Sequence, residues 1–136
     1  MINTLRLRAC GNYSSLGEVF EVLIDGTPLL ELVKQFEQRF DPHIGGAYRA
    51  ALGLDDISKR MLENKATLMP LACDCGQWEC WYLLTQVYCT DDYVCWQHWH
   101  NPYRDAQSTQ HWDYREFDVF TFDKAQYQAE IVKALR

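Results

Sequence analysis

The sequence lacks the short patterns that would assign it to a common class of enzyme. It contains no phosphate-binding glycine loop, no H-E-x-x-H, no G-x-S-x-G and no C-x-x-C pair. No apolar run reaches about 18 residues, so we expect no membrane span. Arg6 and Arg8 interrupt the only apolar stretch at the start, so we expect no signal peptide. The chain is therefore predicted to be cytoplasmic, where cysteines remain thiols or bind metal.

Positive charge is also scarce. Lys and Arg number 13 against 19 Asp and Glu, which gives a net charge of −6. Residues 1–72 have eight basic and nine acidic side chains, whereas residues 73–136 have five and ten. An acidic surface repels nucleic acids and anionic membranes, so we expect neither as a partner. It attracts basic proteins and accelerates their association.

The hydrophobic pattern predicts one α+β domain over residues 1–136, with a mainly antiparallel sheet and two helices. Strands are predicted from alternation and β-branched or aromatic content at 4–10, 19–24, 82–89, 93–99 and 118–122. Helices are predicted over about 28–40 and 123–135, with Thr27 as the first N-cap and Asp123 with Gln126 as a capping box. Residues 43–67 have the least regular pattern, with a helical turn or two expected at 57–62.

Cysteine and tryptophan are in excess, and both concentrate in one segment. Five of the six cysteines and all five tryptophans lie between residues 73 and 114. Cys73, Cys75 and Cys80 form a C-x-C-x4-C pattern, and a turn at Gly76 would let their three thiols converge on one ion. Thiolates are soft ligands that zinc accepts in a tetrahedron. A Zn²⁺ site is therefore one hypothesis for these cysteines; buried or free thiols without a metal are the first alternative, and a redox or disulfide role is the second.

A fourth metal ligand has to come from elsewhere in the chain. His98 and His100 are the best donors, because a spacing of two places both imidazoles on one face of a strand. A turn at Asp91-Asp92 would pair His100 with Leu83, and so bring it close to Cys80. The same turn would pair His98 with Thr85. Cys10, on the first predicted strand, is a competing donor.

The tryptophans predict a binding face. Trp78, Trp99 and Trp112 fall at or near predicted loops, and an exposed aromatic patch is typical of an interaction surface. Acidic residues would form its rim: Asp74, Glu79, Asp105, Asp113 and Glu116. Trp81 and Trp96 fall in predicted strands, and we expect two or three of the five tryptophans to be core. Two further alternatives are that the tryptophans stack on a small ligand, or that His111 with Asp113 acts as a general base.

Part of the sequence resembles a group of small uncharacterised bacterial proteins that share a C-x-C-G-x3-C-W motif. Residues 71–81, Leu-Ala-Cys-Asp-Cys-Gly-Gln-Trp-Glu-Cys-Trp, carry the resemblance. Trp112-Asp113-Tyr114 and residues 120–127 are similar to the later part of the same pattern. The resemblance implies a single bacterial domain and adds nothing about its chemistry, because no activity is attached to the group.

The sequence thus favours a non-catalytic cytosolic module that binds a basic protein partner through an acidic, aromatic-rich face. One concrete form is an immunity or inhibitor protein that blocks a basic toxin. A first alternative is a small zinc- or thiol-dependent enzyme that uses Cys73, Cys75 and Cys80. A second alternative is small-ligand binding by the tryptophan cluster.

Overall fold

Two antiparallel sheets make up most of the computed structural model, which describes residues 2–43, 47–104 and 112–136. The first sheet contains β1 (Leu5–Tyr13), β2 (Gly17–Ile24) and the two-residue strands β3 (Thr27–Pro28) and β5 (Leu52–Gly53). The second has the order β4-β6-β7-β8-β9. Its strands are β4 (Tyr48–Ala50), β6 (Thr67–Cys73), β7 (Tyr82–Cys89), β8 (Tyr93–His100) and β9 (Phe120–Asp123). The predicted α+β class with a mainly antiparallel sheet is confirmed.

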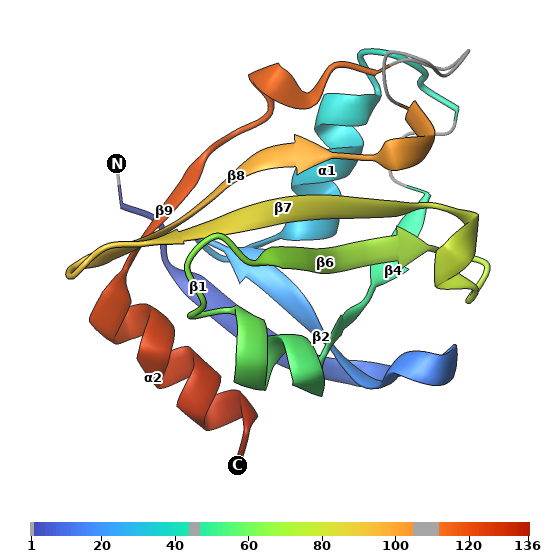
Figure 1. Ribbon diagram of the computed structural model, residues 1–136. Helices are drawn as coiled ribbons and strands as arrows, with labels where there is room; N and C mark the ends of the chain where they lie inside the picture. The colour runs from blue at the N-terminus through green and yellow to red at the C-terminus, as the bar shows by residue number, and fades with distance from the viewer. Residues whose placement is uncertain (1, 44–46, 105–111) are drawn as a thin grey trace.

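Both predicted helices are present. The first, α1 (Leu29–Glu37), lies behind the second sheet in Figure 1 and buries Leu29, Val33 and Phe36. It ends three residues before the predicted boundary. The predicted cap is wrong, because Thr27 pairs with Ile24 in β3 and Pro28 takes the N-cap position.

The second helix, α2 (Lys124–Ala134), lies at the C-terminal end of the chain and packs against the first sheet. The Asp123 carboxylate accepts a hydrogen bond from the Gln126 N–H at 3.0 Å, as the capping pattern predicts. The Gln126 side chain does not return to the cap. It instead accepts from the Leu5 N–H at 3.0 Å and donates to the Leu5 carbonyl at 2.7 Å. These two bonds fix α2 against β1.

The irregular region contains two strands that the pattern did not predict, β4 and β5, and it leads into a third, β6. The helical turn expected near residues 57–62 is present as a π-helical turn, η2 (Asp56–Arg60). The sequence pattern does not predict β6 because this strand contains Pro70, and proline is rare within a sheet. The register of β6 against β7 shifts between Leu68 and Leu71, so Pro70 lies in a bulge, where its missing N–H breaks no regular ladder bond.

The predicted hairpin of β7 and β8 is confirmed, but its register is not constant. Near the turn, Cys89 pairs with Val94 and Gln86 with Gln97, as a turn at residues 91 and 92 requires. Beyond a bulge, His100 pairs with Leu84 rather than Leu83. His98 lies in the bulge with a φ of 60°, so its predicted pairing with Thr85 is also wrong.

The core lies between the two sheets and is closed by the helices. Trp96 is its largest fully buried side chain. Its indole N–H donates to the Tyr127 hydroxyl at 2.9 Å, which in turn donates to the Met61 carbonyl at 2.8 Å. This chain links β8, α2 and the end of η2. Within the described ranges, no helix is long and apolar enough to cross a membrane.

Candidate metal-binding site

The three clustered cysteines lie where β6 turns back into β7, at the right-hand end of the sheet in Figure 1. The Cys73 N–H donates to the Trp81 carbonyl at 2.9 Å, which closes the base of this reversal. Cys80 precedes Trp81 in the short turn η3 (Trp78–Cys80), so the closed base brings Cys80 close to Cys73. Gly76 has a φ of 92°, which side chains disfavour and glycine accepts. It allows the chain to reverse.

The geometry of the sulfurs fits a metal ion. The ligand atoms of Cys73, Cys75 and Cys80 all lie within 4.8 Å of one another. The Sγ atoms of Cys75 and Cys80 are 3.3 Å apart. Zinc–sulfur bonds near 2.3 Å in a tetrahedron place sulfurs about 3.8 Å apart, so small side-chain adjustments suffice. The three cysteines lie close together and could hold a metal ion, as the sequence predicts.

Hydrogen bonds from distant elements hold the loop in shape. The Ala47 carbonyl, just before β4, accepts from the Asp74 N–H at 3.3 Å and from the Trp81 indole at 3.0 Å. The Tyr13 hydroxyl donates to the Cys73 carbonyl at 2.7 Å. The Tyr103 hydroxyl donates to the Glu79 carbonyl at 2.7 Å. The loop is therefore fixed by groups outside it, which reduces the entropy lost when an ion binds.

The electrostatics favour one thiolate among the three cysteines. Hydrogen bonds from the Cys73 thiol, the Gln77 backbone and the Cys80 thiol lower the pKa of Cys75. Burial raises the pKa of Cys73. The hydrogen bond to Cys75 is the main reason that the pKa of Cys80 is raised to about 11. The directions of these pKa shifts make Cys75 the thiol that ionises most easily, and a bound cation would displace the protons of all three.

The predicted fourth ligands do not join the cluster. His98 and His100 are exposed on the outer face of β8. His100 pairs with Leu84, four residues beyond Cys80, which corresponds to about 13 Å along an extended strand. The thiol of Cys10 donates instead to the Val19 carbonyl at 3.6 Å. In the described part of the chain, the group of converging ligands consists of the three cysteines.

The predicted aromatic face is largely absent. Trp99 is 6% exposed and Trp112 is 7% exposed, so neither can belong to a surface patch. The bulge in β8 turns Trp99 inward, where its indole donates to the Asp118 carbonyl at 2.9 Å. Trp112 stacks on Phe40, just after α1, with ring centres 5.5 Å apart. Only Trp78 remains near the surface, half-buried and edge-on to Tyr82.

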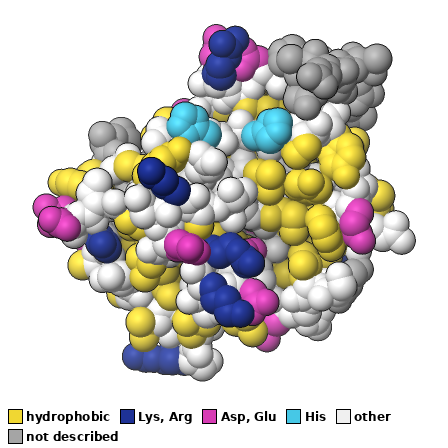
Figure 2. Space-filling view, in the orientation of Figure 1, with side chains coloured by type: hydrophobic (Ala, Val, Ile, Leu, Met, Phe, Trp, Pro, Cys, Tyr) yellow, Lys and Arg dark blue, Asp and Glu magenta, His cyan; other side chains and the backbone are white. Residues whose placement is uncertain are grey.

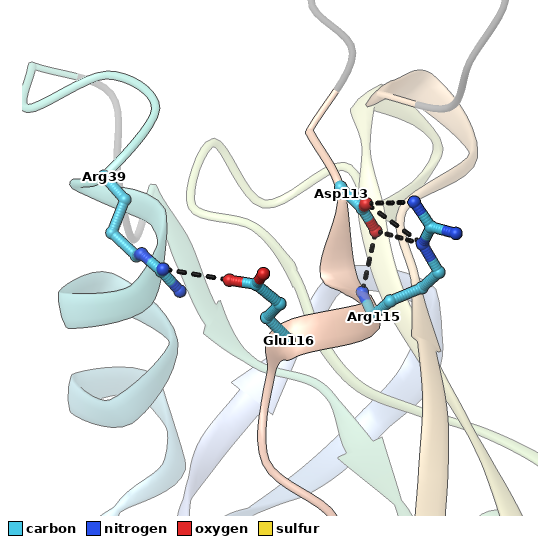
Figure 3. A network of polar contacts seen from close by, with 4 residues as sticks. All are labelled: Arg39, Asp113, Arg115 and Glu116. Carbon is cyan, nitrogen blue, oxygen red and sulfur yellow. Dashed lines mark hydrogen bonds and ion pairs between the residues drawn. The ribbon is translucent and has the colours of Figure 1, made fainter.

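The predicted acidic rim is divided in two. Asp113 pairs with Arg115 and Glu116 pairs with Arg39 (Figure 3), with N–O distances of 2.7 and 3.0 Å. These arginines neutralise that part of the rim. Asp74 and Glu79, beside the cysteines, are exposed and form no ion pair within the described residues. Asp105 and His111 lie outside the described residues.

The reversal at residues 73–81 is called the cysteine loop below. Hydrophobic side chains gather on the surface near this loop, on the right of Figure 2. Trp78, Tyr82 and Tyr103 form a row of edge-to-face rings there, with centres 5.7 and 5.6 Å apart. A groove of about 510 Å³ adjoins Trp78, between the tip of the β1–β2 hairpin and β6. Trp99 lines a different cavity, of about 460 Å³. The tryptophans therefore do not share one ligand pocket.

Several groups that shape the site carried no signal in the sequence. Tyr13, Ala47 and Tyr103 act through single backbone or hydroxyl contacts from segments far along the chain. The spacing of the three cysteines was the only sequence signal that predicted a site in this loop. No family model, no curated protein and no solved structure matches the chain. The resemblance of residues 71–81 to small bacterial proteins therefore stays a prediction.

Proposed function

We propose that this chain is a zinc-binding protein in which Cys73, Cys75 and Cys80 hold one Zn²⁺ ion. The observation that carries the proposal is the convergence of three sulfur ligands within 4.8 Å of one another. Three thiolates favour zinc over the hard cations Mg²⁺ and Ca²⁺, which prefer oxygen ligands. A reducing cytoplasm, which we propose as the location, keeps the thiols available for the metal.

A disulfide is the main competing fate of this cluster. The Cys75 and Cys80 sulfurs are 3.3 Å apart, and all six cysteines are free. A disulfide bond requires about 2.05 Å between sulfurs. It would also leave Cys73 alone, whereas one ion engages all three thiols. We therefore favour the metal and expect it to cross-link the two sides of the β6–β7 reversal.

The proposal keeps the cysteines of the predicted enzyme site but not its histidines, and it assigns no reaction. The predicted protein-binding function, including an immunity or inhibitor role, stays a prediction. Its aromatic anchors are reduced to Trp78, since Trp99 and Trp112 are buried. Its available negative charge is now located at Asp74 and Glu79.

Elemental analysis of protein purified without chelator or added metal tests the proposal. We expect about one zinc ion per chain, and below about 0.2 in Cys75→Ser, which removes an exposed ligand. Cys10→Ser is the matched control, because it removes an exposed cysteine outside the cluster and should keep the full zinc content. Less than half an equivalent in the natural protein, with all six thiols open to a thiol reagent, would contradict the proposal.

A further inference from the structure

We propose that the metal at this site keeps its fourth position open and binds there a neutral imidazole, supplied by a histidine of a basic protein partner. The inference rests on the proposed zinc site and deepens it by naming the partner's chemistry. It follows from three features of the cysteine loop: the number of ligands, their exposure, and the charge around them.

The first feature is that the loop supplies three ligands to an ion that prefers four. No other Cys, His, Asp or Glu among the described residues joins the group. Cys73 is buried, whereas Cys75 and Cys80 are exposed. The side of the cluster opposite Cys73 therefore faces solvent, and an outside ligand can reach an ion there without a change in the fold.

The second feature is local charge, which selects the type of ligand. Three thiolates and one Zn²⁺ leave a net negative charge. Asp74 and Glu79 add further negative charge next to the ligands. A fourth thiolate or carboxylate would add to this negative charge, whereas a neutral ligand adds none. Imidazole is neutral and is a common nitrogen ligand of zinc, so it fits this position best.

The third feature is that the surroundings suit a basic protein. The carboxylates of Asp74 and Glu79 are exposed and have no partner among the described ion pairs. Tyr103, held against Glu79, is 45% exposed and offers an aromatic edge. Lysine or arginine next to the incoming histidine would pair with the two carboxylates. The net charge of residues 73–136 would steer such a partner toward the site.

Cobalt substitution tests the inference directly. Co²⁺ replaces zinc in thiolate sites, and its visible d–d spectrum reports the fourth ligand. The protein used carries Gln in place of His43, His98, His100 and His111, so that no imidazole of its own can bind. We expect added imidazole to change the spectrum in a saturable way. We expect the peptide Gly-Lys-His-Lys-Gly to bind at least about tenfold tighter than Gly-Glu-His-Glu-Gly at low salt, and Gly-Lys-Ala-Lys-Gly to leave the spectrum unchanged.

Two matched variants locate the charge effect. Asp74→Asn with Glu79→Gln should remove most of the preference for the basic peptide. Asp91→Asn with Asp92→Asn removes the same charge at the opposite end of β7 and should keep that preference. If cobalt gives no thiolate charge-transfer absorption, the zinc site itself fails. If that absorption is present and imidazole leaves the d–d bands unchanged, the open position is refuted. Equal affinity for the two histidine peptides would refute the basic partner.

Discussion

At the scale of single residues, Tyr13 shows how the cysteine loop depends on a side chain 60 positions away. Its ring is fully buried, its hydroxyl reaches the Cys73 carbonyl, and the Arg49 guanidinium lies 5.2 Å from its ring centre. The sequence could not predict this role. The alternation that marks β1 breaks where its register shifts between Ala9 and Asn12, so the direction of Tyr13 could not be deduced.

Replacing Tyr13 with phenylalanine should destabilise the protein without changing its fold. The variant keeps the ring but leaves the Cys73 carbonyl with only the weaker bond from the Gly76 N–H at 3.3 Å. We expect a loss of about 1 kcal/mol in the free energy of unfolding, measured in urea at pH 8. Tyr93→Phe is the control, since Tyr93 is 44% exposed. A Tyr13→Phe variant as stable as Tyr93→Phe would show that the bond contributes nothing.

The same phenol should titrate late in the metal-free protein. Burial, and then the nearby thiols of Cys73, Cys75 and Cys80, raise the pKa of Tyr13 to about 12. The folded state thus holds this proton more tightly than the unfolded state. Its contribution to stability is complete below pH about 10 and is lost as the pH rises toward 12. Tyrosinate absorbance of the natural protein minus Tyr13→Phe should show a midpoint near 12, and a midpoint near 10 would contradict this assignment.

At the scale of elements, the sequence predicts where regular strands and helices lie but not where they are interrupted. The alternation of β7 and β8 and the cap of α2 follow from local patterns, and the structure contains them. The bulges in β6 and β8 do not, because a bulge depends on how two strands pack. Missing the bulge at His98 shifted the predicted register by one residue, and that shift wrongly placed His100 near the metal.

The bulge in β8 predicts an unusual response to glycine. His98 holds a left-handed backbone conformation, which costs about 1 kcal/mol or more for a residue with a side chain. We expect His98→Gly to change the free energy of unfolding by less than about 0.5 kcal/mol, because relief of the backbone strain offsets the entropy that glycine loses on folding. His100→Gly, exposed on the same strand with ordinary backbone angles, should lower it by about 0.5–1 kcal/mol. The two variants are compared by urea unfolding. Destabilisation of both would contradict the claim that the His98 backbone is strained.

At the scale of the whole molecule, the fold class and the cysteine site follow from the sequence, whereas the aromatic face does not. Trp96, Trp99 and Trp112 all contribute to one core. The contact between Trp112 and Phe40 joins segments more than 70 residues apart, which no local pattern reveals. The excess of tryptophan is therefore mainly structural, and the excess of cysteine marks the candidate site.

Because Cys73, Cys75 and Cys80 do not belong to the core cluster that contains Trp96, zinc should add stability without being needed for folding. Chelation with EDTA should leave the far-ultraviolet circular dichroism and a cooperative thermal transition intact. Zinc at one hundred times its dissociation constant should add about 2.7 kcal/mol, which raises the melting temperature by about 5–10 °C. In Cys75→Ser the rise should vanish. Loss of the transition on chelation would show instead that the metal is required for folding.

The central claim is that three cysteine sulfurs of one chain bind zinc, and X-ray absorption at the zinc edge tests it most directly. We predict a first shell of three sulfurs at about 2.3 Å and one nitrogen or oxygen at about 2.0–2.1 Å. The sulfur count should fall to two in any Cys80→Ser protein that retains metal. A zinc shell made only of nitrogen and oxygen, unchanged by Cys80→Ser, would contradict the account.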